Sequence, residues 1–213
     1  MKLRYLPGLI AFVVVAACGK EQSLEGPYRS NVCDYAPYAE GSLFEYEQTG
    51  GTPADTIHYT LRASGDTSLN GEPYILLEDD ATGGFSLFRC NGGEYMQLVD
   101  VSSLPNAPEE PVRTVYLRDD LPRGGSWTET LPLTVPGLGE LALTLRYTIV
   151  EKGTVKVVLG KEYKDVIGVQ MDVSMPPLVL PQVLSTSFFA KGVGLIQADT
   201  EEDTTRLKAY TIR

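Results

Sequence analysis

The chain has 213 residues and a formal net charge of −10 at pH 7, from 18 basic and 28 acidic side chains. This length suits one domain with a single sizeable core. An acidic surface argues against nucleic acid as a partner, because phosphate binding needs clusters of basic residues. His58 is the sole histidine, so a metal site is not expected.

The first segment has the pattern of an export signal. Lys2 and Arg4 precede an apolar stretch of 12 residues from Leu6 to Ala17, with no acid among them. A transmembrane helix needs about 20 apolar residues, whereas a signal peptide needs fewer. The tetrapeptide Val15-Ala16-Ala17-Cys18 follows, and the whole segment resembles a bacterial lipoprotein signal peptide with its lipobox.

The resemblance implies that residues 1–17 are removed and that Cys18 carries lipid, palmitate included. A multiply acylated cysteine is a durable membrane anchor, whereas a single chain is marginal. In many Gram-negative lipoproteins, an Asp directly after the lipidated cysteine retains the protein in the inner membrane. This chain has Gly19 at that position, which implies delivery to the outer membrane, on its periplasmic side or at the cell surface. A plain secretory signal with a coincidental cysteine is the alternative.

Residues 18–32 are polar, with Gly26 and Pro27 among them. This composition predicts a lipidated flexible tether, followed by a single all-β domain over 33–213. Cys33 and Cys90 are the remaining cysteines. In an oxidising compartment an isolated pair predicts a disulfide, and two free buried thiols are the alternative.

From about Cys33 onward, apolar and polar residues alternate between short turns, which is the pattern of β-strands. No segment of the mature chain shows the period of an amphipathic helix over three turns. The alternation predicts strands at Leu43–Thr49, Thr56–Ala63, Glu72–Glu78, Phe85–Cys90, Glu94–Val101, Val112–Arg118, Leu131–Val135, Leu141–Ile149, Thr154–Leu159, Tyr163–Val173, Thr186–Ala190, Val193–Ala198 and Thr204–Ile212.

So many strands joined by short turns predict an all-β antiparallel meander. A flat sheet of this width would leave long exposed edges. We therefore expect the sheet to curl into a half-barrel, to close into a barrel or to fold over as a sandwich. The pattern does not distinguish these three forms.

Two proline-rich stretches break the alternation. Residues 104–111 are acidic, and residues 175–182 are apolar. An apolar loop must be covered by the core, by a partner or by a ligand. The second stretch is therefore a candidate ligand or partner loop, and its candidate residues are Met175, Pro176, Pro177, Leu178, Val179 and Leu180.

Catalytic signatures are weak in this sequence. His58 falls on the polar face of its strand, so we expect it to face solvent rather than a nucleophile. The acidic clusters 78–80, 119–120 and 201–203 match no calcium-loop spacing. We expect Trp127 to plug the core, and we expect no cofactor and no metal besides the lipid on Cys18.

Four short segments resemble uncharacterised all-β envelope lipoproteins of Gram-negative bacteria: Tyr35–Tyr46, Gly125–Trp127, Lys161–Ile167 and Phe188–Ile196. The resemblance implies no activity. With the anchor and the strand pattern, it favours a non-enzymatic binding or accessory protein that holds an apolar small molecule or an envelope protein partner. The alternatives are a structural or adhesion module without a small-molecule site, and a carboxylate-based glycan hydrolase.

Overall fold

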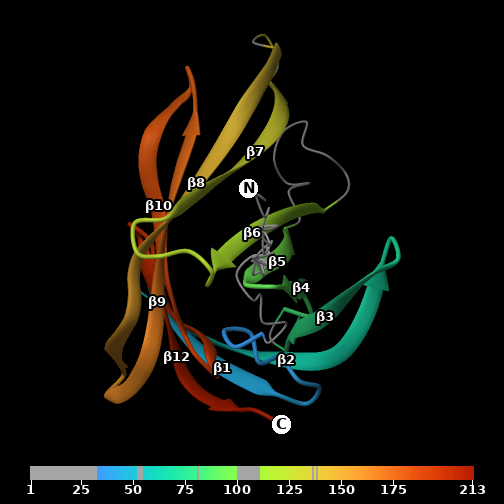
Figure 1. Cartoon of the computed structure of the whole chain (residues 1–213), viewed down its shortest axis with the longest axis vertical. Helices are drawn as coiled ribbons and strands as arrows, with labels where there is room; N and C mark the ends of the chain where they lie inside the picture. Colours follow the sequence, from blue (N-terminus) through green and yellow to red (C-terminus); the bar gives the residue numbers. More distant parts are fainter. Residues whose placement is uncertain (1–32, 52–54, 81, 100–110, 136, 138) are drawn as a thin grey trace, which may run out of the picture.

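The computed structural model describes residues 33–51, 55–80, 82–99, 111–135, 137 and 139–213. The predicted signal peptide, Cys18, the tether and most of the acidic proline-rich stretch lie outside these residues. The described residues form one antiparallel sheet of 12 strands and contain no α-helix (Figure 1). Accordingly, no membrane-spanning helix is found in the described ranges.

The 12 strands cover most positions at which the sequence predicts strands. Their bounds are β1 (Leu43–Gly50), β2 (Asp55–Leu69), β3 (Glu72–Asp79), β4 (Phe85–Asn91), β5 (Glu94–Val99), β6 (Val112–Arg118), β7 (Ser126–Val135), β8 (Gly139–Val158), β9 (Lys161–Met175), β10 (Val179–Ala190), β11 (Gly194–Asp199) and β12 (Asp203–Thr211).

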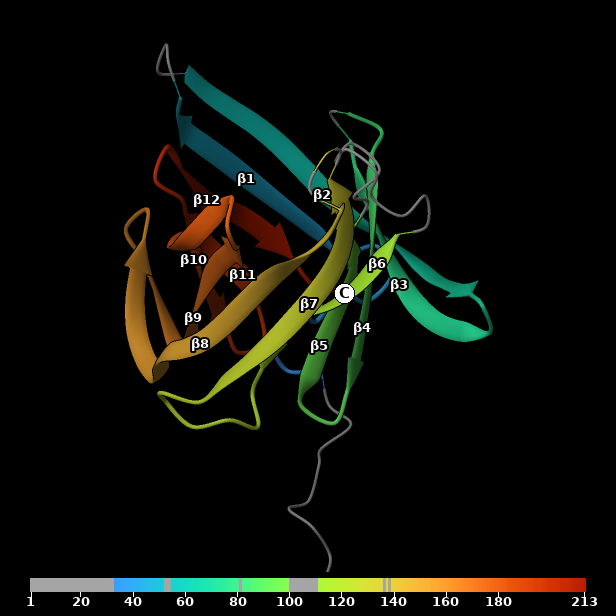
Figure 2. The same ribbon diagram turned by 90° about the horizontal axis from the view of Figure 1, so that it is seen from above.

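The order of strands confirms the antiparallel meander and selects the barrel among the three expected forms. The sheet runs β6-β5-β4-β3-β2-β1-β12-β11-β10-β9-β8-β7. The first and last strands therefore pair in the middle of the sheet, with Phe44 opposite Tyr210. The sheet curls until its two edges, β6 and β7, face each other, and Figure 2 shows the resulting nearly closed ring.

Strand β8 corrects one prediction. The sequence indicated two strands, Leu141–Ile149 and Thr154–Leu159, but β8 is continuous from Gly139 to Val158. The register against β9 shifts three times between Ile149 and Lys156, and Gly153 has a φ of 67°. Bulges of this kind add unpaired residues, so they disrupt the alternation of side chains without ending the strand.

The apolar proline-rich stretch is a second correction. It was predicted as a loop over 175–182, but Met175 ends β9, and β10 begins already at Val179, which pairs with Met175. Pro181 lies where the register shifts between Val179 and Gln182. Proline lacks an amide proton but is tolerated at such bulges. Its presence in the sequence therefore predicted a loop where β10 already begins.

Residues 33–42 close one end of the barrel, which we call the plugged end (Figure 1, blue). Tyr35, Ala36 and Tyr38 of this segment are buried in the core. The predicted disulfide joins Cys33 to Cys90 at the end of β4. Consecutive turns of an antiparallel meander alternate between its two ends. The disulfide places the β4–β5 turn beside this segment, and a hydrogen bond from the Gly192 amide to the Asp34 carbonyl places the β10–β11 turn there. By the same alternation the β8–β9 turn belongs to this end.

Loss of the disulfide is expected to lower the free energy of unfolding by about 4 kcal/mol, because the bridge closes a long loop in the unfolded chain. Its cysteines are 57 residues apart. Urea denaturation of the Cys33→Ser/Cys90→Ser variant measures the loss. A reductant should destabilise the wild type to the same level and leave the variant unchanged. Equal stability of the two oxidised proteins would contradict the prediction.

Candidate functional site

A cavity of about 180 Å³ lies in the centre of the barrel. Strands β1 to β6 and β8 to β11 each contribute to its wall. Its lining residues are Tyr38, Tyr46, Leu61, Leu77, Phe88, Gln97, Tyr116, Tyr147, Val169, Met171, Ser185, Ser187, Phe189 and Leu195.

The alternation of strand residues places these side chains in the interior. On β10, Ser185, Ser187 and Phe189 stand at every second position and share one face. Ser187 pairs with Val169 and Ser185 with Met171 of β9. Because residues directly opposite each other point to the same side of a sheet, both strands present polar and apolar groups side by side.

Aromatic rings form the part of the wall nearest the plugged end. Tyr38 meets the rings of Phe44 and Phe88 edge-on, at centroid distances of 5.4 and 5.3 Å. Phe88 meets Tyr116 at 5.7 Å, and Tyr116 meets Phe189 at 5.5 Å. Edge-to-face contacts of this kind are favourable beyond the area that they bury. The chain of rings therefore gives the cavity a rigid floor.

The lining carries no charge at physiological pH. Burial raises the pKa of Tyr38, Tyr46 and Tyr116 far above the usual tyrosine value. Burial, with Glu129 as a second cause, raises the pKa of Tyr147 to about 12. No carboxylate, histidine, lysine or arginine is among the described residues that line the cavity. Its chemistry therefore suits a neutral molecule.

Polar groups in the cavity are few. The Tyr46 hydroxyl donates to the backbone carbonyl of Leu195 at 3.0 Å. The buried Tyr116 hydroxyl lacks a well-formed hydrogen bond, although Tyr38 lies near enough to influence its pKa. A buried hydroxyl without a partner is costly. Tyr116, with Gln97 and Ser187 nearby in the lining, can therefore serve a polar group on a bound molecule.

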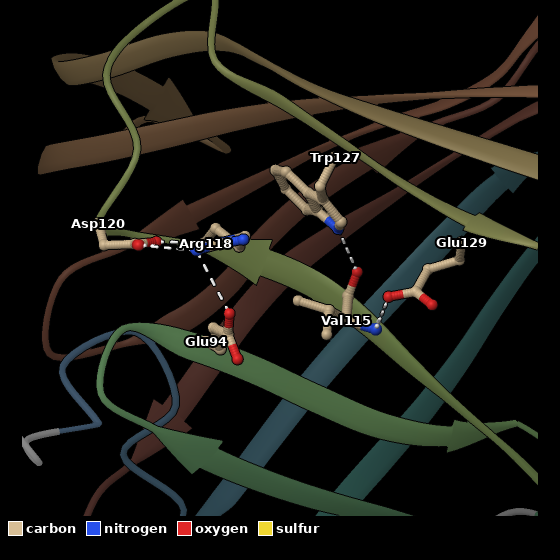
Figure 3. A network of polar contacts seen from close by, with 6 residues as sticks. All are labelled: Glu94, Val115, Arg118, Asp120, Trp127 and Glu129. Atoms are coloured by element: carbon tan, nitrogen blue, oxygen red, sulfur yellow. Dashed lines mark hydrogen bonds and ion pairs between the residues drawn. The ribbon is translucent and has the colours of Figure 1, made fainter.

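Side chains close the gap between the two sheet edges beside the cavity (Figure 3). The Trp127 indole nitrogen of β7 donates to the Val115 carbonyl of β6 at 2.8 Å. The Val115 amide in turn donates to Glu129 Oε1 at 3.4 Å. A neighbouring strand would satisfy the same two backbone groups. We call this contact the seam.

The seam continues into the cavity wall and down to the plugged end. The Trp127 ring stacks on Tyr147, which lines the cavity, at 5.1 Å and 6° between planes. At the foot of β6, Arg118 Nη2 lies 2.8 Å from Asp120 and 3.3 Å from Glu94 (Figure 3). These ion pairs hold the start of the β6–β7 connection against β5.

The candidate site residues that the sequence analysis singled out lie in different parts of the structure, and none of those that the structure describes lines the cavity. The six candidate residues 175–180 do not line the cavity. They lie at the β9–β10 hairpin, where Leu178 and Leu180 are 50% and 75% exposed. His58 is exposed on β2. Trp127 is only partly buried and closes the seam, rather than plugging the core as expected.

The acidic clusters lie at the surface, except that the partly buried Asp119 accepts a hydrogen bond from the Tyr95 hydroxyl at 2.7 Å. Within the described residues, no group of three or more His, Cys, Asp or Glu side chains is placed to hold a metal ion. The polar lining residues Gln97, Ser185 and Ser187 were not singled out from the sequence. The sequence pattern that could have indicated them is the pair Ser185 and Ser187, which alternate along the strand ahead of the apolar Phe189.

Fold and cavity together define an antiparallel β-barrel with a small neutral interior site. The sequence matches no protein-family model and no curated protein. A solved structure from Parabacteroides distasonis, described as a lipoprotein, is similar with a TM-score of 0.52 at 8% identity, over 82% of this chain and 97% of that chain. At such low identity the likeness establishes the fold alone.

A protein from Bacteroides fragilis, described as exported and as having a YmcC-like fold, is also similar. Its TM-score is 0.49 at 13% identity, and the match covers 81% of this chain and 96% of that chain.

Replacement of Trp127 by Phe tests the seam. Phenylalanine keeps a ring beside Tyr147 but leaves the Val115 carbonyl without its donor, so the free energy of unfolding should fall by about 1–2 kcal/mol. Hydrogen exchange at residues 115–117 should become faster. Glu129→Gln is the matched control, since its amide oxygen still accepts from Val115. Unchanged exchange in Trp127→Phe would contradict the role of the indole.

Proposed function

We propose that this protein is a lipid-anchored envelope protein whose barrel binds a small, neutral and largely apolar molecule without transforming it. The cavity of about 180 Å³ carries this proposal, because it combines an aromatic floor with a few uncharged polar groups. Concave, mostly apolar sites with a few placed polar groups are typical of ligand pockets.

The volume limits the ligand. An apolar cavity of about 150 Å³ accommodates benzene, and pockets for drug-sized molecules begin at about 300 Å³. The cavity here, of about 180 Å³, lies between these values. It therefore suits a single ring or a short chain carrying one hydroxyl or amide, rather than a complete lipid.

A binding role fits the lining better than a catalytic role. General acid–base catalysis needs a group whose pKa lies near the working pH. The tyrosines of the lining have pKa values raised away from neutrality. The described lining also offers no pair of carboxylates for glycan hydrolysis.

The anchor is proposed from the lipobox Val15-Ala16-Ala17-Cys18. The Parabacteroides distasonis neighbour, itself described as a lipoprotein, supports this assignment. Gly19 favours the outer membrane as the destination. The described residues begin at Cys33, and in the sequence residues 19–32 would separate the lipid from the barrel.

A structural or adhesion module is the second candidate. Leu178, Leu180 and Val183 of the β9–β10 hairpin are 50%, 75% and 55% exposed, and a protein partner could cover them. This role would leave the cavity without a function.

Filling the cavity should abolish ligand binding. With indole as the probe, the thermal midpoint of the wild type should rise, because a ligand that binds the native state stabilises it. Ser187→Leu should show no rise, since its side chain would occupy the cavity. Thr186→Leu is the matched control, because its position alternates with Ser187 and faces the other side of β10. An equal rise in Ser187→Leu would contradict binding in the cavity.

Acylation should depend on Cys18 alone. In bacteria grown with a clickable fatty acid, the wild type should incorporate the label into the membrane fraction, and Cys18→Ala should not. The Cys33→Ser/Cys90→Ser variant should retain the label, which controls for general loss of cysteine. Label in Cys18→Ala, or none in the wild type, would contradict the anchor.

A further inference from the structure

The β8–β9 hairpin presents a row of exposed aliphatic side chains. Val155, Val157 and Leu159 are 58%, 62% and 49% exposed. Val158 lies between two of them and is only 2% exposed, because alternate residues of β8 point into the core. Val155 and Val157 therefore stand side by side on the outer face of the strand.

The same hairpin is basic in an acidic protein. Residues 152–164 contain four lysines and one glutamate, a net charge of +3 in a chain of −10, and one carboxylate flanks them at each end, Glu151 and Asp165. The Lys156 ammonium lies over the ring of Phe188 at 3.5 Å, and that of Lys161 over Tyr210 at 3.9 Å. Aromatic faces hold these cations in place without neutralising them. We call residues 152–164 the basic hairpin.

The basic hairpin lies at the end of the barrel where the tether joins the fold. The β8–β9 turn and residues 33–42 both belong to the plugged end, in the lower part of Figure 1. The Asp165 carboxylate, one residue beyond the hairpin, contributes to raising the pKa of Tyr35, after burial and Asp119. Asp34 pairs with Lys191 at 2.9 Å on the adjacent β10–β11 turn.

We propose that the basic hairpin rests on the surface of the membrane and contacts anionic lipid, with Val157 in the headgroup region. This inference rests on the proposed anchor at Cys18. Lysines close to exposed aliphatic side chains are typical of surfaces that lie on anionic bilayers. On the face of Val157 the charged residues are Glu162, directly opposite, and Lys164, whose ammonium lies 3.9 Å from the Glu162 carboxylate. The charge of the hairpin is complementary to such lipids, whereas the protein as a whole is not.

Because the predicted tether would hold the domain near the membrane, a weak contact between the basic hairpin and the lipid is sufficient. Residues 19–32 form a chain of 14 residues between the lipid and Cys33. A flexible chain of this length has an average end-to-end distance of about 20 Å. The predicted tether would therefore keep the plugged end close to the bilayer and give a high effective concentration of lipid at the hairpin.

The β9–β10 hairpin provides a matched comparison. Its Leu180 is 75% exposed, more than Val157, but residues 175–184 contain no lysine or arginine. This hairpin belongs to the opposite end of the barrel. An apolar side chain there should therefore remain in water while the basic hairpin meets the membrane.

The test uses the full acylated protein in vesicles of phosphatidylcholine and phosphatidylglycerol. Val157→Cys and Leu180→Cys are each labelled with an environment-sensitive fluorophore; Cys33 and Cys90 are already bridged. At position 157 we expect emission shifted to the blue and at least twofold quenching by nitroxide-labelled lipid. At position 180 we expect the emission of the fluorophore in water and no quenching.

The charge is tested in the Val157→Cys background. Lys161→Glu/Lys164→Glu, or vesicles of phosphatidylcholine alone, should reduce the quenching at position 157 by at least half. Equal spectra at positions 157 and 180, or quenching that ignores both changes, would overturn the proposal. Contact of a protein partner instead of lipid would give a blue shift without lipid quenching, which also overturns it.

Failure of the anchor is seen separately. Each labelled protein is first floated with the vesicles, and flotation depends on the acyl chain. A protein that does not float refutes the anchor. The fluorophores are then read at a high vesicle concentration, where a water-like spectrum at position 157 refutes the lipid contact as well.

Discussion

The seam between β6 and β7 is the constraint on which the rest of the structure depends. A sheet of 12 strands has two edges, and unpaired edges invite pairing with other chains. Here the edges meet without a backbone ladder in the described residues, and Trp127 and Glu129 supply the donor and the acceptor that Val115 would otherwise find in a neighbouring strand. Side chains of β7 thus satisfy the backbone groups of Val115 that no neighbouring strand in the described part of the chain pairs with.

Closure at the seam creates the interior. Trp127 stacks on Tyr147, and Tyr116 follows Val115 on β6, so the groups that join the edges border the cavity. Burial of the tyrosine side chains inside the closed sheet raises their pKa values, so the lining stays neutral. The closed sheet therefore has a neutral interior and an acidic exterior. This separates the proposed ligand site from the charged surface.

The two ends of the barrel differ in chemistry. The plugged end holds the disulfide, the buried tyrosines of residues 33–42 and the basic hairpin. The opposite end holds the acidic turn at 78–80 and the exposed leucines of the β9–β10 hairpin. With the proposed lipid on Cys18, this difference would orient the molecule, with the plugged end toward the bilayer.

The sequence by itself determined the strands and the antiparallel meander, because alternation with a period of two residues is a local property. It also predicted the disulfide, since only one pair of cysteines remains after Cys18, but left two free thiols as the alternative until the structure showed the bridge. Tertiary structure decided the continuity of β8 and β10, where bulges and Pro181 disrupt the alternation that local reading relies on. It alone decided the closure and the cavity, because Val115 and Trp127, or Gln97 and Ser187, meet only when the whole sheet curls.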